Sequence, residues 1–197
     1  MHVADTIHPV ILTVAESDRQ LRGRSKVRTL SVRARIALAD SARWADMELG
    51  TLAKDARGAP LPCEGIHWSV THKSDFVAAV AARSPVGIDL ERRQPVSQAL
   101  YTRLAGPDEW RLGGVRDEAL FLRYWTAKEA VLKAVGQGLA GLARCRIEAI
   151  LNESYLKVVY ESDEWLVAQC PIGATHLAAV TLCGEAVEWH LPVDGVF

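Results

Sequence analysis

The spacing of apolar residues along the chain predicts two long helices. Apolar residues recur every three or four positions over residues 30–52, with no Gly or Pro until close to the end. The same period runs through residues 117–135, where Gly136 follows directly, and glycine is the residue that most often follows a helix. Two shorter helices are predicted, one over residues 97–105 and one that starts at Gly106 and Pro107.

Short apolar runs bounded by turn residues predict strands between and after these helices. The predicted strands cover residues 66–71, 76–82, 86–91, 145–151, 155–160, 164–170 and 176–183. The first fifteen residues contain an apolar run at positions 10–12 but no basic region ahead of it, which favours another strand over a signal peptide. Helices and strands therefore mix along the chain, and we predict an α+β fold.

The two halves of the chain carry a short sequence echo. Residues 76–80 read Phe-Val-Ala-Ala-Val, and residues 177–180 read Leu-Ala-Ala-Val. Each half also runs through a helix and then strands. We therefore predict two similar lobes, an N-terminal lobe of residues 1–95 and a C-terminal lobe of residues 96–197.

The charges of the whole chain nearly cancel, but they are unevenly distributed. There are 23 Lys and Arg against 24 Asp and Glu, so no global field draws the protein to nucleic acid or to an anionic membrane. The longest apolar stretches are far shorter than the roughly eighteen residues of a membrane-spanning helix. Residues 19–35, in contrast, hold seven basic residues and no acidic one.

This basic segment has three interpretations. It could form a cationic pocket for a phosphate group together with His72 and Lys73, which lie in the turn between two predicted strands. It could equally be a solvated face or a flexible segment. Binding to RNA or DNA is the least favoured interpretation, because the segment has no aromatic residue that could stack on a base.

The four cysteines stand far apart in the sequence and form no Cys-x-x-Cys pair. This spacing predicts free thiols in a reducing cytoplasm, and it argues against disulfides or a zinc site built on cysteine. These cysteines are Cys63, Cys145, Cys170 and Cys183.

Two acidic residues lie close together on the predicted strand 86–91. Side chains alternate along a strand, so the carboxylates of Asp89 and Glu91 point to the same side and could hold a hard metal ion together. Taken alone, however, two acids near a strand end are more often simply solvated.

A second set of polar residues lies on the predicted helix 117–135. Trp125, Glu129 and Lys133 are spaced four residues apart and form one stripe along the helix. Alone, Glu129 and Lys133 would be an ordinary surface pair. Apolar and aromatic neighbours such as Phe121 and Leu132 instead place Glu129 at the edge of a buried seam.

The motifs of several common enzyme classes are absent from the sequence. It contains no Gly-x-Ser-x-Gly elbow, no Gly-x-x-x-x-Gly-Lys-Thr loop, no complete Gly-x-Gly-x-x-Gly turn and no His-Glu-x-x-His.

In combination, the two acidic segments resemble a known family. Residues 86–95, Val-Gly-Ile-Asp-Leu-Glu-Arg-Arg-Gln-Pro, resemble its Gly-Ile-Asp-Ile-Glu block, and residues 125–139 resemble its Trp-x-x-Lys-Glu-Ala block with the Lys and Gly residues that follow. Thr71-His72 and residues 35–40 are similar to two weaker motifs. The sequence thus resembles the 4'-phosphopantetheinyl transferases, specifically the larger type that serves polyketide and peptide synthases.

This resemblance implies a fold, a reaction and a location. The fold would be a pair of α+β lobes related by a pseudo-twofold axis, with the active site in the cleft between them. The enzyme would transfer the phosphopantetheine arm of coenzyme A to a serine of an acyl or peptidyl carrier protein. It would use Mg²⁺ and release adenosine 3',5'-bisphosphate. We expect a cytoplasmic monomer that binds neither nucleic acid nor membrane.

The resemblance also implies roles for individual residues. The Mg²⁺ ligands would be Asp89, Glu91 and Glu129, and Glu129 would in addition take the proton of the carrier serine. Lys133 would contact the phosphate that leaves, and Lys128 a phosphate nearby.

On the coenzyme side, the resemblance assigns His72 and Arg35 to the 3'-phosphate region. Three positions depart from the family pattern: Ala59 stands where the family has a lysine, Lys73 where it has a small serine, and Thr71 where it has a serine. Lys73 would either replace the lost charge or crowd the coenzyme pocket. The alternative function is therefore a non-catalytic module of the same fold that binds coenzyme A or a carrier.

Carrier recognition would require an exposed apolar patch with positive charge beside it. The candidates by position are Trp110, Leu112, Arg116 and Phe121. For Trp110 and Phe121, a place in the core is at least as consistent with their residue types.

Overall fold

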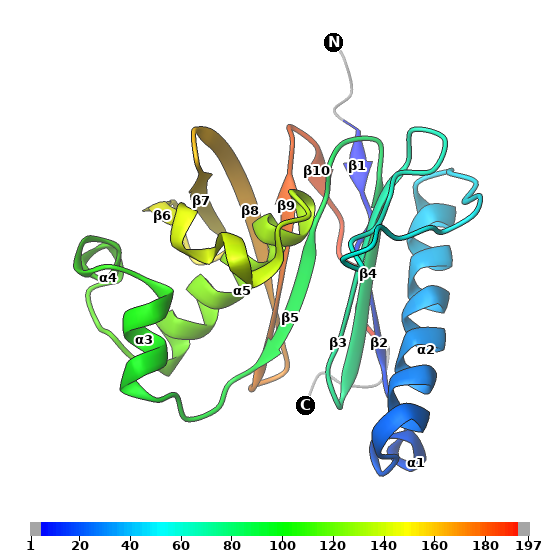
Figure 1. Cartoon of the computed structure of the whole chain (residues 1–197), viewed down its shortest axis with the longest axis horizontal. Coiled ribbons are helices and arrows are strands. Elements are labelled where there is room, and N and C mark those ends of the chain that lie inside the picture. Colours follow the sequence, from blue (N-terminus) through cyan, green and yellow to red (C-terminus); the bar gives the residue numbers. More distant parts are fainter. Residues whose placement is uncertain (1–4, 193–197) are drawn as a thin grey trace.

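The computed structural model of the chain describes residues 5–192 and confirms a mixed α+β fold (Figure 1). Two antiparallel sheets stand side by side, and one long helix packs against each of them. Within residues 5–192, no helix is long and apolar enough to cross a membrane.

The first sheet has three strands in the order β2 (Val10–Thr13), β4 (Phe76–Ala82) and β3 (His67–His72). Helix α2 (Gly23–Trp44), preceded by the single turn α1 (Glu16–Arg19), covers one face of this sheet. Apolar residues at helical spacing on α2 pack against β4, which is the physical reason that this segment is helical. The buried apolar residues of α2 are Leu30, Ala34, Ala37, Leu38 and Ala42.

Helix α2 begins seven residues earlier than the apolar spacing predicts and ends eight residues earlier. The early turns carry exposed basic residues, so no apolar period marks them. At the other end, Asp46 adopts a left-handed backbone conformation with φ of 51° and stops the helix. Leu49 and Leu52 still pack against the core of this sheet, but they do so from a loop.

The second sheet has five strands in the order β5, β9, β8, β7 and β6. Its bounds are β5 (Ile88–Arg92), β6 (Cys145–Ile150), β7 (Tyr155–Tyr160), β8 (Asp163–Ile172) and β9 (His176–Leu182). Helix α5 (Glu118–Ala134) lies across this sheet and contacts every one of its strands. The remaining short elements are α3 (Gln98–Leu104), α4 (Pro107–Gly113) and the 3₁₀ helix η1 (Gly138–Arg144).

The division between the two sheets falls between β4 and β5, earlier than the predicted boundary at residue 95. Strand β5 belongs to the second sheet because it pairs with β9, in a register that sets Asp89 opposite Ala179. The two ends of the described chain also meet, since β1 (Thr6–Ile7) pairs in parallel with β10 (Ala186–Val187). The structure therefore joins residues that the predicted lobes would separate.

One close approach brings α5 onto β5. A Cβ atom at Gly87 would lie 1.9 Å from the carbonyl oxygen of Ala130, so no side chain fits between strand and helix at this point. The helix itself is defined at both ends: Asp117 accepts a hydrogen bond from the Leu120 amide at 2.8 Å, and Gly136 follows with φ of 67°. As a result, β5 and the stripe of α5 that bears Glu129 are neighbours.

Candidate functional site

Asp89 is the most buried of the predicted acids, with 3% of its surface exposed. Its Oδ1 atom accepts hydrogen bonds from Lys133 Nζ at 2.7 Å and from the hydroxyl of Thr71 at 3.3 Å. Lys133 Nζ also donates to the carbonyl of Ile88 at 3.0 Å. The second carboxylate oxygen, Oδ2, is buried without a hydrogen-bond partner, which is costly unless something else satisfies it.

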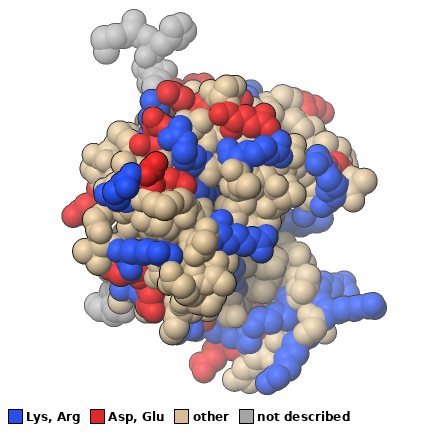
Figure 2. All heavy atoms as spheres, turned by 60° about the vertical axis from the view of Figure 1, so that its left-hand side comes forward, with Lys and Arg blue, Asp and Glu red and all other residues tan. Residues whose placement is uncertain are grey.

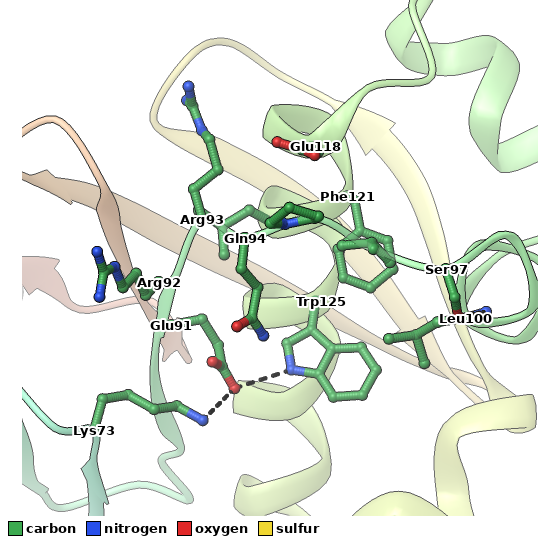
Figure 3. A pocket seen from close by; sticks show the side chains of 13 residues that line it. Lys73, Glu91, Arg92, Arg93, Gln94, Ser97, Leu100, Glu118, Phe121 and Trp125 are labelled. Carbon is green, nitrogen blue, oxygen red and sulfur yellow. Dashed lines mark hydrogen bonds and ion pairs between the residues drawn. The ribbon is translucent and has the colours of Figure 1, made fainter.

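Glu91, two residues further along β5, is half-buried and held from two sides. Lys73 Nζ lies 2.6 Å from its Oε1, and the indole Nε1 of Trp125 donates to the same oxygen at 3.2 Å (Figure 3). Burial raises the pKa of Glu91, and the charge of Asp89 adds to this, while Lys73 and Trp125 oppose the shift. The structure thus confirms that Asp89 and Glu91 lie on one strand facing α5.

Glu129 on α5 completes the acidic group. Its pKa is raised to about 7, first because burial disfavours the charged form and then because of the charges of Asp89 and Glu91. Lys133 and Lys73 act in the opposite direction. The predicted stripe on α5 therefore lies at the edge of a buried seam. It presents a carboxyl group, that of Glu129, whose pKa is close to 7.

The residues present fit Mg²⁺, the ion that the resemblance implies. A divalent cation would satisfy the orphaned Asp89 Oδ2 and would remove the repulsion that raises the pKa of Glu91 and Glu129. The three acids do not form a closed cage: in the described part of the chain, their oxygens do not all lie within 4.8 Å of one another. Instead, Lys133 pairs with Asp89 and Lys73 pairs with Glu91. Such an open arrangement is compatible with Mg²⁺, which commonly binds through few carboxylates together with water and substrate phosphates.

A basic pocket opens on one side of this acidic group. Lys133 lines it from α5, and Lys54 and Arg57 line it from the loop that precedes β3. Sequence reasoning missed Lys54 and Arg57, although Arg57 lies two residues before Ala59, the position that lacks the expected lysine. Ala59 lines the same pocket, so two neighbouring cations supply charge where that lysine is absent.

His72 lies at the end of β3, near this basic pocket. Burial lowers the pKa of His72, and the charges of Lys133, Lys73 and Lys54 lower it further. The positive charges of these three lysines therefore act on the imidazole, and a bound anion would reduce the repulsion between them. Sequence reasoning placed His72 in a turn, whereas the structure gives it the last position of a strand.

Arg35 is exposed on α2 and is not among the residues that line the basic pocket. The beginning of α2 does approach the site, since Lys26 Nζ donates to the hydroxyl of Ser74 at 3.3 Å in the turn after β3. Figure 2 shows Lys and Arg side chains gathered at the lower right, below a hollow in the surface. The basic segment is thus a solvated helix face whose first turns lie beside His72 and Lys73.

Lys128 requires a correction, because the structure places it away from this group. It is 1% exposed, and its Nζ lies 2.6 Å from Glu109 Oε1 and 2.7 Å from the carbonyl of Leu104. Its position on α5 turns it into the core beneath α4, whereas Glu129 and Lys133 face β5. Lys128 is therefore a buried ion-pair residue and not a phosphate contact.

A second pocket opens on the other side of the acidic group (Figure 3). Apolar side chains line one part of it, among them Leu100, Phe121 and Trp125. Polar and charged side chains line the rest: Lys73, Glu91, Arg92, Arg93, Gln94, Ser97 and Glu118. This pocket is therefore mixed in character and carries acids as well as bases, whereas the charged side chains of the first pocket are all basic.

The predicted carrier-docking residues have different environments. Trp110 and Phe121 each expose 6% of their surface and belong to the core cluster around α5. Leu112 is exposed, and the guanidinium of Arg116 lies 5.3 Å from the Trp110 ring. The core alternative therefore holds for Trp110 and Phe121, although Phe121 also lines the second pocket.

Comparison with known proteins assigns the chain to a family. The family model of the 4'-phosphopantetheinyl transferase superfamily matches residues 85–191, a span that includes all three acids and Lys133. The chain therefore belongs to the 4'-phosphopantetheinyl transferase superfamily.

Individual relatives agree with this family. The chain is 30% identical over 151 residues to the 4'-phosphopantetheinyl transferase HetI of Nostoc sp. (strain PCC 7120 / SAG 25.82 / UTEX 2576), covering 69% of this chain and 63% of the relative. It is 33% identical over 78 residues to psf-1 of Bacillus pumilus, covering 38% and 34%. The L-aminoadipate-semialdehyde dehydrogenase-phosphopantetheinyl transferase of Pongo abelii is 30% identical over 158 residues, covering 66% and 49%. The matches thus span between about a third and just under two thirds of these relatives' length.

Proposed function

We propose that the protein transfers the 4'-phosphopantetheine arm of coenzyme A to a serine of an acyl or peptidyl carrier protein, releasing adenosine 3',5'-bisphosphate. The observation that carries this proposal is the position of Lys133. Its amine holds Asp89 in the acidic group, while its side chain also lines the basic pocket. A diphosphate lying across Lys133 would have its nucleotide on the basic side and the reacting phosphorus beside the acids.

The two pockets match the two ends of coenzyme A. Lys54 and Arg57 supply positive charge for the phosphates of the nucleotide end, and His72 stands beside them for the 3'-phosphate. Arg35 would approach the same phosphate from α2. On the opposite side, the second pocket offers both apolar side chains and hydrogen-bonding groups, which suits the amides and the sulfur of the pantetheine arm.

Asp89, Glu91 and Glu129 would hold Mg²⁺, which when bound supplies charge neutralisation to the phosphates. Glu129, on α5 beside the other two acids, would take the proton of the carrier serine hydroxyl. The serine oxygen forms a bond to the β-phosphorus of coenzyme A, and the bond from that phosphorus to the bridging oxygen breaks. The negative charge leaves with adenosine 3',5'-bisphosphate, and the ammonium of Lys133 neutralises it.

We extend the proposal to the setting of the protein. The four free cysteines fit a reducing compartment, which supports a cytoplasmic location. A site built from α5, β3 and β5 of one chain supports action as a monomer, and the two sheets, each with its helix, support a pair of pseudo-twofold lobes. The resemblance of residues 86–95 and 125–139 to the larger type of transferase implies carriers of polyketide or peptide synthases as partners, and no role in nucleic-acid or membrane binding is proposed.

The direct test is a carrier modification assay. The purified protein is mixed with coenzyme A, Mg²⁺ and an apo carrier protein, and the carrier is weighed by mass spectrometry. We expect a mass increase equal to one phosphopantetheine group, which disappears when the carrier serine is replaced by alanine. If coenzyme A binds in a separate titration while no carrier gains mass, the non-catalytic binding module is correct and the transferase proposal is wrong.

A further inference from the structure

The two ends of the described chain are joined at a site that the proposed reaction does not use. Residues 5–9 run parallel to residues 186–190, and the amide of Glu188 donates to the carbonyl of Ile7 at 3.0 Å. The amide of His190 donates to the carbonyl of Pro9 at 2.9 Å. This register sets Glu188 opposite His8 and His190 opposite Val10, and residues two apart in an extended segment point to one side, so the three side chains lie on the same side.

The side chains of these three residues converge. His8 Nδ1 lies 3.0 Å from His190 Nε2 and 3.8 Å from Glu188 Oε2. Among residues 5–192, they form the one group of three His, Cys, Asp or Glu whose ligand atoms all lie within 4.8 Å of one another. Two ligand atoms on a tetrahedral zinc ion would be about 3.3 Å apart, and the two distances bracket that value.

The surroundings hold the imidazoles in this arrangement. Trp44, at the end of α2, stacks on His190 with the ring centroids 4.4 Å apart and an interplanar angle of 17°. His8 lies in the same stack, 6.4 Å from Trp44. Backbone hydrogen bonds and an aromatic stack therefore preorganise three ligand atoms before any ion arrives.

We propose that His8, Glu188 and His190 form a binding site for a divalent transition-metal ion of the zinc class. Two imidazoles and one carboxylate are a donor set that zinc accepts with a fourth position for water, and Glu188, with 64% of its side chain exposed, faces the solvent that would supply it. Mg²⁺ prefers oxygen ligands, so this site and the acidic group select different ions.

The bound ion would act as a clamp on the fold. It would connect the segment before β2 to the segment after β10, which are about 180 residues apart in sequence, and it would do so beside the end of α2. An ion that binds the folded chain and not the unfolded chain stabilises the fold in proportion to the logarithm of its concentration. Because the site shares no residue with the acidic group, we expect turnover to be unchanged.

Cobalt(II) is the probe for this site, because a tetrahedral cobalt complex absorbs strongly in the visible range. The protein carries no affinity tag, is stripped with a chelator and is held in excess Mg²⁺, so that the acidic group does not take up cobalt. We expect one equivalent of Co²⁺ to produce the tetrahedral absorption, one equivalent of Zn²⁺ to abolish it, and saturating Zn²⁺ to raise the melting temperature.

Three variants make the assignment specific. Glu188→Gln changes an exposed side chain and will fold, and we expect it to weaken Zn²⁺ binding by at least about tenfold. His190→Asn should abolish the cobalt spectrum and the shift in melting temperature. His67→Gln, on β3 away from this group, is the matched control and should bind as the wild type does.

Each result decides the proposal. It is overturned if the stripped wild type shows no tetrahedral cobalt spectrum, or if Glu188→Gln and His190→Asn bind Zn²⁺ as tightly as His67→Gln does. It is also overturned if Zn²⁺ binds at these residues without raising the melting temperature, because the clamp would then be absent. Loss of binding in both site variants, with wild-type binding in the control, supports it.

Discussion

The acidic group and the basic pocket meet at Lys133, yet they are built in different ways. The acids come from β5 and α5, two elements in close contact; Asp89 is buried, and Glu91 and Glu129 are half-buried. Lys54 and Arg57 come from a loop, and both are exposed to solvent. Buried charges interact strongly with one another, whereas exposed charges are screened by water and salt.

This difference predicts how each side responds to mutation. Changes among the acids should alter the rate of the chemical step, because these groups are fixed beside the reacting phosphorus. Changes in the basic pocket should alter the affinity for coenzyme A, because exposed cations away from the reacting phosphorus contribute mainly to binding.

The largest expected effect is at Glu129. Glu129→Gln should lower turnover by roughly 10²- to 10⁴-fold, because it removes a positioned base and a carboxylate ligand at once. Steady-state kinetics with an apo carrier measures this, and circular dichroism checks that the fold is intact. Near-normal turnover in a folded variant would refute the role of Glu129.

Two lysines on α5 provide the next test. Lys128→Met should destabilise the fold by about 3–5 kcal/mol, because Glu109 is then a buried charge without its partner. Its Michaelis constant for coenzyme A should be unchanged in the folded fraction. Lys133→Met should do the reverse, with impaired catalysis and a smaller loss of stability. Chemical denaturation and kinetics separate the two, and equal catalytic losses would mean that Lys128 does contact substrate.

Smaller effects are expected in the basic pocket. Arg57→Ala should raise the Michaelis constant for coenzyme A by roughly tenfold, the usual cost of one charge-assisted contact, with little change in turnover. The matched control is Arg103→Ala, because Arg103 is an exposed arginine on α3 that does not line the basic pocket. A loss in turnover instead of affinity would contradict the proposed division of labour.

Arg35→Ala tests the 3'-phosphate assignment. It should raise the Michaelis constant for coenzyme A while affecting 3'-dephospho-coenzyme A less, because the second substrate lacks the group that Arg35 would contact. The measurement is the ratio of kcat/KM for the two substrates. Equal losses for both would remove Arg35 from the site.

The last test is the pH dependence of stability. Because the pKa of Glu129 is about 7 in the folded protein and 4.5 for an unperturbed glutamate, the folded state binds more protons between these values. The free energy of unfolding contributed by this group therefore falls as the pH rises through that window. Glu129→Gln should be relatively more stable than the wild type above pH 7, and urea denaturation across the window measures it. An identical pH slope in both proteins would show that Glu129 has an ordinary pKa.

The sequence predicts the acids better than the cations, for a physical reason. Asp89, Glu91, Glu129 and Lys133 lie on regular elements, where a fixed period decides which side chains share a face. Lys54 and Arg57 lie in a loop without a period, and only the fold brings them to Lys133.

Lys128 shows the limit of reasoning from a motif. It is one position from Glu129, yet one step along a helix turns a side chain by about 100° and here directs it into the core. Its partner Glu109 comes from α4, which no local pattern connects with α5. Sequence patterns likewise place strand β5 in the first lobe, because its partner β9 lies almost ninety positions later.

Gly87 gives the scaffold of the site a property that is useful for redesign. Since the main chain of β5 touches the main chain of α5 there, the separation between these elements does not depend on how large the neighbouring side chains are. Chemically different groups can therefore be exchanged at positions 89, 91 and 129 on an unchanged frame. An engineer seeking altered ion preference would vary those three positions and leave the glycine untouched.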